Sequence, residues 1–465
     1  MWLTLGASLF WARPASADLV LFDKDGWTFF TDGRINSFYS LGYGDAFPTP
    51  TPNPTPPIVD PNGVEIPAPT HSIVGDGQQI FNAGFANDQG LQGKFLASRV
   101  RSGFLGSIIA FGMKREVTET TAIKSYVSLW QTAQTNLRTR VADTIASDLP
   151  AAKNQFKSFD VREGWLAFEG RAGTLIAGRQ NGILGGMSTE IDFLYGHNFG
   201  LGLPCVEPYF PACGHIGSGA LGPGNGSAFT YTTPSLGGLR LKAGFYDPVR
   251  LLGAWERTPY PRPEGALMFE RRPSASVMFK LQVEGMYQYM AQIGERRTDR
   301  VWGVAGGARL EAGPLRLGVS GFRGKGLGAY VALQNAASTF EPASRNFRYF
   351  TGMYAQLALV FGREQLSAGA GRVIADQLDA DKVDFGKSNL KSQSGISGAF
   401  YHRVTDNFVL GIDYLLFHTE WWGAPNSTNM IDPSTNNPVA IALPGFLKGE
   451  KQTVHFVNVG ATFHW

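Results

Sequence analysis

Two carboxylates, Glu190 and Asp192, stand two residues apart in the middle of the chain. In an extended segment, residues at this spacing point to the same side. Arg99 and Arg101 have the same spacing and share one face of a predicted strand at 93–103. Carboxylates and guanidinium groups arranged in rows create a local electric field. The chemistry that these residues favour is therefore the selection of ions and dipolar solutes.

Catalytic and metal-binding patterns are poorly represented. The seven histidines form no nucleophile and base motif, and the chain lacks the G-x-S-x-G run of many hydrolases. No cluster of histidine, cysteine and carboxylate residues has the regular spacing of metal ligands. We therefore predict no enzymatic activity, no cofactor and no metal site, and a barrel hydrolase is the alternative from the class of enzymes.

Composition indicates what kind of scaffold positions these charges. Charged residues make up 17% of the 465 residues, against about 25% in ordinary soluble domains, and glycine contributes 58. The sequence has no apolar run of about 18 residues, and its mean hydropathy is -0.10, which excludes a helical membrane protein. The net charge of +3 is too small to predict a nucleic-acid partner.

The N-terminus has the pattern of an export signal. A short apolar stretch at 2–12 is followed by the small-residue triplet Ala15-Ser16-Ala17, which is typical of a signal-peptide cleavage site. We predict a signal peptide at 1–17 and a mature chain at 18–465. The alternative is a buried helix or a first strand at 2–12.

The two cysteines, Cys205 and Cys213, are eight positions apart. In an exported protein, an isolated pair of this kind predicts a disulfide that closes a small loop. Two free thiols, or a metal site that includes His197 or His215, are the alternatives.

The mature chain repeats segments of about ten residues that alternate in polarity and are separated by Gly, Pro, Asn and Asp. We predict about sixteen strands, an even number that is typical of a membrane barrel with an aqueous channel. The predicted strands are 27–40, 93–103, 105–117, 156–169, 173–180, 227–234, 239–247, 266–280, 281–293, 299–311, 315–323, 346–361, 364–374, 393–403, 407–420 and 452–465.

Connections between these strands alternate between short and long. The short ones are predicted tight turns at 170–172, 235–238, 312–314 and 404–407. The long ones are 45–92, 118–155, 181–226, 248–265, 324–345, 375–392 and 421–451, and part of 118–155 is compatible with a helix. One rim of short turns and one of long loops is typical of outer-membrane barrels.

The last strand carries a sharp pattern. Val459, Ala461, Phe463 and Trp465 fall on one face of it, and the polar side of the alternation holds Asn458, Gly460, Thr462 and His464. A lipid-facing row opposite a polar lumen requires this alternation. Asn458, Gly460, Phe463 and Trp465 also resemble the C-terminal assembly signal of outer-membrane proteins. An ordinary amphipathic edge strand is the alternative.

Two internal segments resemble the general, trimeric porins of Gram-negative bacteria. The run at 170–180, GRAGTLIAGRQ, is similar to the turn and fifth strand of that family, which lead into its long third loop. The run at 229–239, FTYTTPSLGGL, resembles the family's next hairpin. Both motifs and the C-terminus are in register with the predicted strands, so the resemblance covers most of the mature chain.

The resemblance implies an all-β fold, a transmembrane antiparallel β-barrel of about 16 strands whose third loop, about 181–226, folds into the lumen. It implies a homotrimer in the bacterial outer membrane, in contact with membrane lipid and lipopolysaccharide, and delivered by the outer-membrane assembly machinery. The implied function is passive diffusion of small hydrophilic solutes and ions. A substrate-selective channel for anions or sugars is the alternative.

In that family, carboxylates of the third loop face a ladder of basic side chains on the barrel wall. The matching residues here are Glu190 and Asp192 on the loop, with the basic side chains Arg34, Arg99, Arg101 and Arg179 on the wall. Arg179 matches the arginine of the family's G-R-Q run. Charges scattered over a wet lumen without such a constriction are the alternative.

Overall fold

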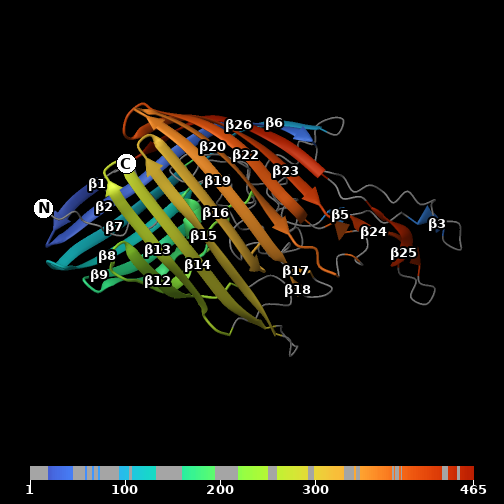
Figure 1. Ribbon diagram of the computed structural model, residues 1–465, viewed down its shortest axis with the longest axis horizontal. Helices are drawn as coiled ribbons and strands as arrows, with labels where there is room; N and C mark the ends of the chain where they lie inside the picture. Colours follow the sequence, from blue (N-terminus) through green and yellow to red (C-terminus); the bar gives the residue numbers. More distant parts are fainter. Residues whose placement is uncertain are drawn as a thin grey trace.

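The chain forms a closed antiparallel β-barrel of 16 strand positions in the computed structural model (Figure 1). Closure occurs where the first barrel strand, β2, pairs with the last, β26, from Arg34 opposite His464 to Gly44 opposite Val454. This confirms the predicted fold class and strand number. The structure describes residues 19–45, 58–59, 65–66, 72–73, 94–103, 107–131, 160–193, 218–249, 259–291, 298–328, 340–341, 346–379, 382, 387–388, 390–431, 438–447 and 451–465. The predicted signal peptide and both cysteines lie outside these residues.

The strands of the barrel sheet are β2 (Trp27–Asp45), β6 (Lys94–Arg101), β7 (Ser107–Thr118), β8 (Thr121–Gln131), β9 (Asp160–Gly170), β10 (Gly173–Asn181), β11 (Asn225–Thr232), β12 (Leu239–Tyr246), β13 (Arg262–Ser274), β14 (Val277–Ala291), β15 (Thr298–Ala312), β16 (Leu315–Lys325), β19 (Tyr349–Phe361), β20 (Glu364–Ala375), β22 (Leu390–Arg403), β23 (Phe408–Trp421) and β26 (Lys451–His464). The remaining elements are β1 (Leu19–Lys24), β3 (Ile58–Val59), β4 (Glu65–Ile66), β5 (Ser72–Ile73), α3 (Gly186–Glu190), β17 (Phe340–Glu341), β18 (Asn346–Phe347), β21 (Lys387–Ser388), β24 (Ala424–Ile431) and β25 (Pro438–Leu447). None of the helices in the described ranges is long and apolar enough to cross a membrane.

One strand was missed and two predicted strands share a position. β6 pairs with Phe38–Asp45 of β2, and β7 pairs with Trp27–Arg34 of the same strand, so both lie on one side of β2. The missed strand is β8, inside the segment that we expected to be a long loop. Its inward positions include Tyr126 and Trp130, and aromatic residues on the polar side obscure the alternation.

The hairpin of β13 and β14 also differs from the prediction. Its turn lies between Ser274 and Val277, and not at the expected position between 280 and 281. Lys280 is therefore an early, inward position of β14, paired with Glu270. A further strand, β1, precedes the barrel and pairs with the first residues of β2.

The two rims differ as expected. The four predicted tight turns are confirmed between β9 and β10, β11 and β12, β15 and β16, and β22 and β23. Figure 1 shows the C-terminus at the rim that carries these turns. The long connections leave from the opposite rim.

Polarity is inverted relative to a soluble barrel. Along β14, the side chains of Gln282, Glu284 and Gln288 are buried, whereas the neighbouring Leu281 and Val283 are exposed. The same alternation runs along the last strand, where Asn458, Thr462 and His464 are buried and Val459 and Phe463 are exposed. The barrel thus has an apolar outer face and a polar inner face.

Candidate pore constriction

The connection after β10 turns onto the inner wall of the barrel and its two ends run side by side. The backbone N–H of Gly182 donates to the carbonyl of Gly224 at 2.5 Å. The hydroxyl of Ser188 donates to the carbonyl of Leu221 at 2.5 Å. Residues 181–193 and 218–226 therefore support each other as they cross the wall; we name them the inner segment.

The first wall residue to hold the inner segment is Glu264 of β13. Its Oε2 accepts hydrogen bonds from the backbone N–H groups of Ile183, at 2.6 Å, and Leu184, at 3.0 Å. Its Oε1 lies 2.8 Å from Nε of Arg262, and both side chains are 3% exposed. Burial of this carboxylate is thus offset by an ion pair and two backbone donors.

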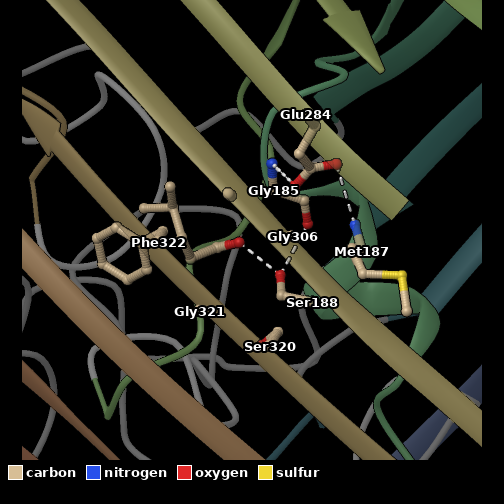
Figure 2. Close-up of a pocket in the computed structure, with 10 residues that line it drawn as sticks. Gly185, Met187, Ser188, Glu284, Gly306, Ser320, Gly321 and Phe322 are labelled. Atoms are coloured by element: carbon tan, nitrogen blue, oxygen red, sulfur yellow. Dashed lines mark hydrogen bonds between the residues drawn. The ribbon is translucent and has the colours of Figure 1, made fainter. Parts of the chain in front are cut away.

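Glu284 of β14 holds the next turn in the same way (Figure 2). Its oxygens accept from the N–H groups of Gly185, at 2.7 Å, and Met187, at 3.3 Å. Gly185 has φ of 92°, a left-handed conformation that glycine adopts readily. Hydrogen bonds to a charged acceptor contribute about 1.5–3 kcal/mol each. The two wall carboxylates therefore hold residues 183–187 of the inner segment.

Apolar packing lies beneath this attachment. Met187 and Ile191 are fully buried and cluster with Ala220 and Tyr354. Burying such a side chain contributes about 1.5–3 kcal/mol. A Cβ atom on Gly318 of β16 would lie 2.8 Å from the Cβ of Ile191, so glycine leaves room for the inner segment at this point of the wall.

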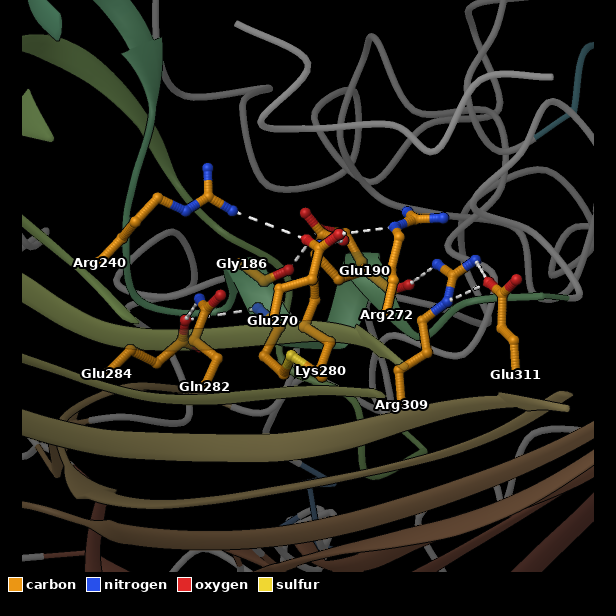
Figure 3. Close-up of polar contacts among 12 residues, drawn as sticks. Gly186, Glu190, Arg240, Glu270, Arg272, Lys280, Gln282, Glu284, Arg309 and Glu311 are labelled. Carbon is orange, nitrogen blue, oxygen red and sulfur yellow. Dashed lines mark hydrogen bonds and ion pairs between the residues drawn. The ribbon is translucent and has the colours of Figure 1, made fainter. Parts of the chain in front are cut away.

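Glu190 ends the short helix α3 and forms an ion pair with the wall (Figure 3). Its Oε2 lies 2.6 Å from Nζ of Lys280, and the two side chains are 9% and 18% exposed. Lys280 is also 3.7 Å from Glu270, which pairs with Arg240 and Arg272 at 3.6 and 3.2 Å. The inner wall thus carries a connected network of both charges.

Arg309 of β15 holds the end of α3. Its Nη1 donates to the carbonyl oxygen of Glu190 at 2.5 Å, and its guanidinium lies 4.8 Å over the ring of Phe193. The same guanidinium pairs with Glu311. Arg309 therefore fixes the backbone of the inner segment while its charge is balanced on the wall.

Asp192 attaches to a different part of the wall. Its Oδ1 accepts from Nε2 of Gln356 at 2.8 Å, and Oε1 of Gln356 accepts from the N–H of Phe193 at 2.7 Å. The prediction of an extended segment through Glu190 and Asp192 is wrong, because the helix α3 ends at Glu190. The helix turn directs one acid to β14 and the other to β19.

The expected arginines fall in three different places. Arg34 is buried on the inner face, with its guanidinium 6.0 Å from the ring of Trp130, and Arg162 lies 4.9 Å from the same ring. Arg99 and Arg101 pair with Ser40 and Phe38 of β2, which are inward positions. The side chains of Arg99 and Arg101 lie outside the described residues.

Arg179 has a placement that differs from the expected one. In β10 the inward side chains are Ile176 and Gln180, whereas Arg179 belongs to the alternate set with exposed Leu175. Its partner on β11, Ser227, belongs to the exposed set there as well. The resemblance of the G-R-Q run predicted where this arginine lies along the strand. The register of β10 with its neighbours shows that it belongs to the outward set.

The contacts of the inner segment come mainly from residues that we did not select from the sequence: Lys280, Glu264, Glu284, Arg309, Gln356 and Arg162. Arg162 lay on the polar side of a predicted strand, so alternation could have identified it. Lys280 ended a predicted strand, and the misplaced turn concealed its role. For the glutamates and Gln356, the signal was a polar residue in the middle of an apolar strand.

The predicted assembly signal lies where the barrel closes. Trp465 exchanges two backbone hydrogen bonds with Gly33, at 3.0 and 3.2 Å, and its ring lies 6.2 Å from that of Phe463. Asn458 faces inward and donates to Asp413 at 2.6 Å, and Gly460 pairs with Phe38. The alternation predicted for this strand is confirmed.

Comparison with known proteins finds a similar fold among solved structures of outer-membrane channels and porins. No family model and no curated protein sequence matches the chain. Among solved structures, the channel DcaP of Acinetobacter baumannii has a TM-score of 0.58 at 10% identity, covering 96% of this chain and 100% of that one. The anion-selective porin from Comamonas acidovorans has a TM-score of 0.54 at 12% identity, covering 94% and 100%. Salmonella typhi OmpF has a TM-score of 0.51 at 11% identity, covering 96% and 99%.

Proposed function

We propose that this chain, which has the fold of the outer-membrane porins, forms a water-filled channel for passive diffusion of small hydrophilic solutes and ions. The observation that carries the proposal is the inverted polarity, since buried Gln282 and Glu284 alternate with exposed Leu281 and Val283 on one strand. An apolar outer face suits lipid, and a barrel of this strand number leaves an aqueous interior.

The constriction that we propose is formed by the inner segment and the wall that faces it. Glu190 and Asp192 supply the acidic groups, and Lys280 belongs with them because it pairs with Glu190. Arg34 supplies the basic side, together with Arg162 at the same tryptophan ring. Arg99 and Arg101 extend this side, since their backbone pairs with inward positions of β2.

A selective channel for anions is the second candidate. Arg34 and Arg162 both lie against Trp130, so two cations share one region of the inner face. On the other side, Glu190 is already paired with Lys280. A wall of this kind favours anions in the constriction. The porin from Comamonas acidovorans, which has a similar fold, is anion-selective, and this agrees with the second candidate.

The proposal includes the surroundings of the barrel. We place it in the bacterial outer membrane, in contact with lipid and lipopolysaccharide, after export by a signal peptide and insertion by the assembly machinery. A homotrimer follows from the family resemblance and is tested by native electrophoresis. We also propose a disulfide between Cys205 and Cys213, tested by mass spectrometry of the unreduced protein.

Single-channel recording in planar bilayers tests the function. We expect ohmic steps with weak ion selectivity, and a strong preference for anions supports the second candidate. Insertion without conductance, together with turnover of ester or peptide substrates, overturns the channel in favour of a hydrolase. The recording also separates the two channel readings, because the reversal potential in a salt gradient measures selectivity directly.

A further inference from the structure

A cluster of cations surrounds one carboxylate on the outer face of the barrel, at the rim of the long connections. Glu420 of β23 lies 3.1 Å from Nζ of Lys451, 3.4 Å from Nζ of Lys391 and 3.5 Å from Nη2 of Arg372. Nε2 of His418 is also 3.5 Å away. Four strands, β20, β22, β23 and β26, thus bring basic groups to one point; we name it the Glu420 cluster.

Strand register places this cluster on the outer face. Glu420 pairs with Lys451. The adjacent pair, Thr419 with Gln452, is buried and faces the lumen, so Glu420 and Lys451 face the opposite side of the sheet. Arg372 pairs with Met353, which is 71% exposed. Inner-face charges such as Lys280 are therefore separate from this cluster, and its cations face the surroundings of the barrel.

The cations remain accessible even though they contact Glu420. The side chain of Glu420 is 14% exposed, whereas those of Arg372, Lys391 and Lys451 are 53%, 40% and 61% exposed. Three positive groups against one carboxylate leave two positive charges. The largely covered carboxylate therefore gathers cations whose side chains remain accessible.

The outer face is apolar below the cluster, toward the middle of the barrel. Ile396 of β22 is an outward position, 60% exposed, and its partner Leu416 lies four residues from Glu420. Ile412 of β23 and Val459 of β26, 46% and 49% exposed, lie eight residues from Glu420 and Lys451. Lys391 lies 5.3 Å over the ring of Trp422, whose Nε1 donates to the carbonyl of Ala375. Cations at the edge of an apolar surface match an amphiphile that has an anionic head and hydrocarbon chains.

We propose that the Glu420 cluster binds the phosphate groups of an anionic lipid in the membrane leaflet at this rim, with the acyl chains on the apolar surface below. Arginine and lysine are the side chains that bind phosphate best. A phosphate monoester carries about two negative charges, which match the excess here, whereas a carboxylate or sulfate head carries one. The inference rests on the proposed membrane location, and it concerns the outer face and not the channel.

Retention of lipid by the purified, folded barrel tests the site. The probe is bisphosphorylated lipid A, compared with its dephosphorylated form, and bound lipid is counted by native mass spectrometry. We expect the triple variant Arg372→Gln, Lys391→Gln, Lys451→Gln to retain at least about tenfold less of the phosphorylated lipid. The dephosphorylated lipid should bind the wild type and the variant equally weakly.

A matched control removes three exposed cations at the opposite rim, by Lys24→Gln, Arg171→Gln and Arg271→Gln. Equal retention by the wild-type barrel and the triple variant overturns the proposal, as does an equal loss in the control. Displacement of the lipid by millimolar inorganic phosphate points to a free-phosphate site and also overturns it. Heat-modifiable electrophoretic mobility checks folding, and Lys451→Gln alone, expected to lower retention about threefold, serves if the triple variant does not fold.

The outcome is separable from the proposed channel. The triple variant should conduct like the wild type, because the cluster faces away from the lumen. A wild-type barrel that retains phosphorylated lipid but does not conduct refutes the channel alone. If the barrel conducts, but the wild type and the triple variant retain the same amount of lipid, the lipid site alone is refuted.

Discussion

Nζ of Lys280 lies 2.6 Å from Oε2 of Glu190, which joins the inner segment to the barrel wall through one largely buried ion pair. Removal of either partner leaves the other charge exposed to the pore. We predict that Glu190→Gln shifts the reversal potential toward anion selectivity, and that Lys280→Gln shifts it toward cations. The change in permeability ratio should be several-fold at about 0.1 M salt and small at about 1 M, where screening acts over about 3 Å.

The double variant Glu190→Gln, Lys280→Gln is the control for this pair. Because it removes one charge of each sign, its selectivity should return close to that of the wild type. Unchanged reversal potentials in both single variants at low salt, with folded and conducting barrels, contradict the placement of this pair at the constriction.

The attachment of the inner segment through Glu284 gives a second prediction. Glu284→Ala removes the acceptor of the Gly185 and Met187 N–H groups, at about 1.5–3 kcal/mol for each hydrogen bond. We expect a looser segment, seen as higher open-channel noise and a larger mean conductance. Glu116→Ala, at an inward position that is 61% exposed, removes the same charge from the wall and should leave the noise unchanged. Equal noise in the two variants refutes the role of Glu284.

Topology is tested by chemical labelling of cysteines in a Cys205→Ser, Cys213→Ser background. Cysteines placed within 46–93 and 422–450 should react with an impermeant reagent on intact cells. Thr405 lies in the short turn between β22 and β23, where its hydroxyl accepts from the N–H of Phe408 at 3.0 Å. Thr405→Cys should react only after permeabilisation of the outer membrane. The reverse labelling pattern would mean that the barrel has the opposite orientation in the membrane.

Deletion of Trp465 tests the last strand. Trp465 exchanges two backbone hydrogen bonds with Gly33 where the barrel closes, and an aromatic residue at this position anchors the membrane interface. We predict a sharp drop in folded barrel in the outer membrane, measured by heat-modifiable mobility of membrane fractions. The variant Trp465→Phe keeps an aromatic terminus, so its folded barrel should accumulate in the outer membrane like the wild type. Wild-type levels after the deletion argue against an assembly role.

Local patterns in the sequence were sufficient for the class of fold. Alternation of polarity along a strand depends only on successive residues, so Asn458, Thr462 and His464 could be assigned to one face and Val459 and Phe463 to the other. Turn residues marked four of the short connections for the same reason. These signals determined the barrel and its two unequal rims. The predicted strand number agreed with the structure because the missed strand β8 was offset by two predicted strands that share one position.

Tertiary structure decided which charges meet. Glu190 and Lys280 are 90 residues apart, and only the path of the inner segment along the wall brings them together. The face of Arg179 depended on the register of β10 with its neighbours. Such choices follow from pairing between strands that are distant in the chain, and a one-residue shift in pairing reverses every face.

The Glu420 cluster follows from the same principle. Arg372, Lys391, Glu420 and Lys451 belong to four strands, and each alone is an unremarkable charge near a strand end. Lateral pairing of β20, β22, β23 and β26 places them side by side. The sequence alone thus determined an amphipathic barrel, because alternation is a local property. The fold decided where its charges converge, because convergence requires hydrogen bonding between distant strands.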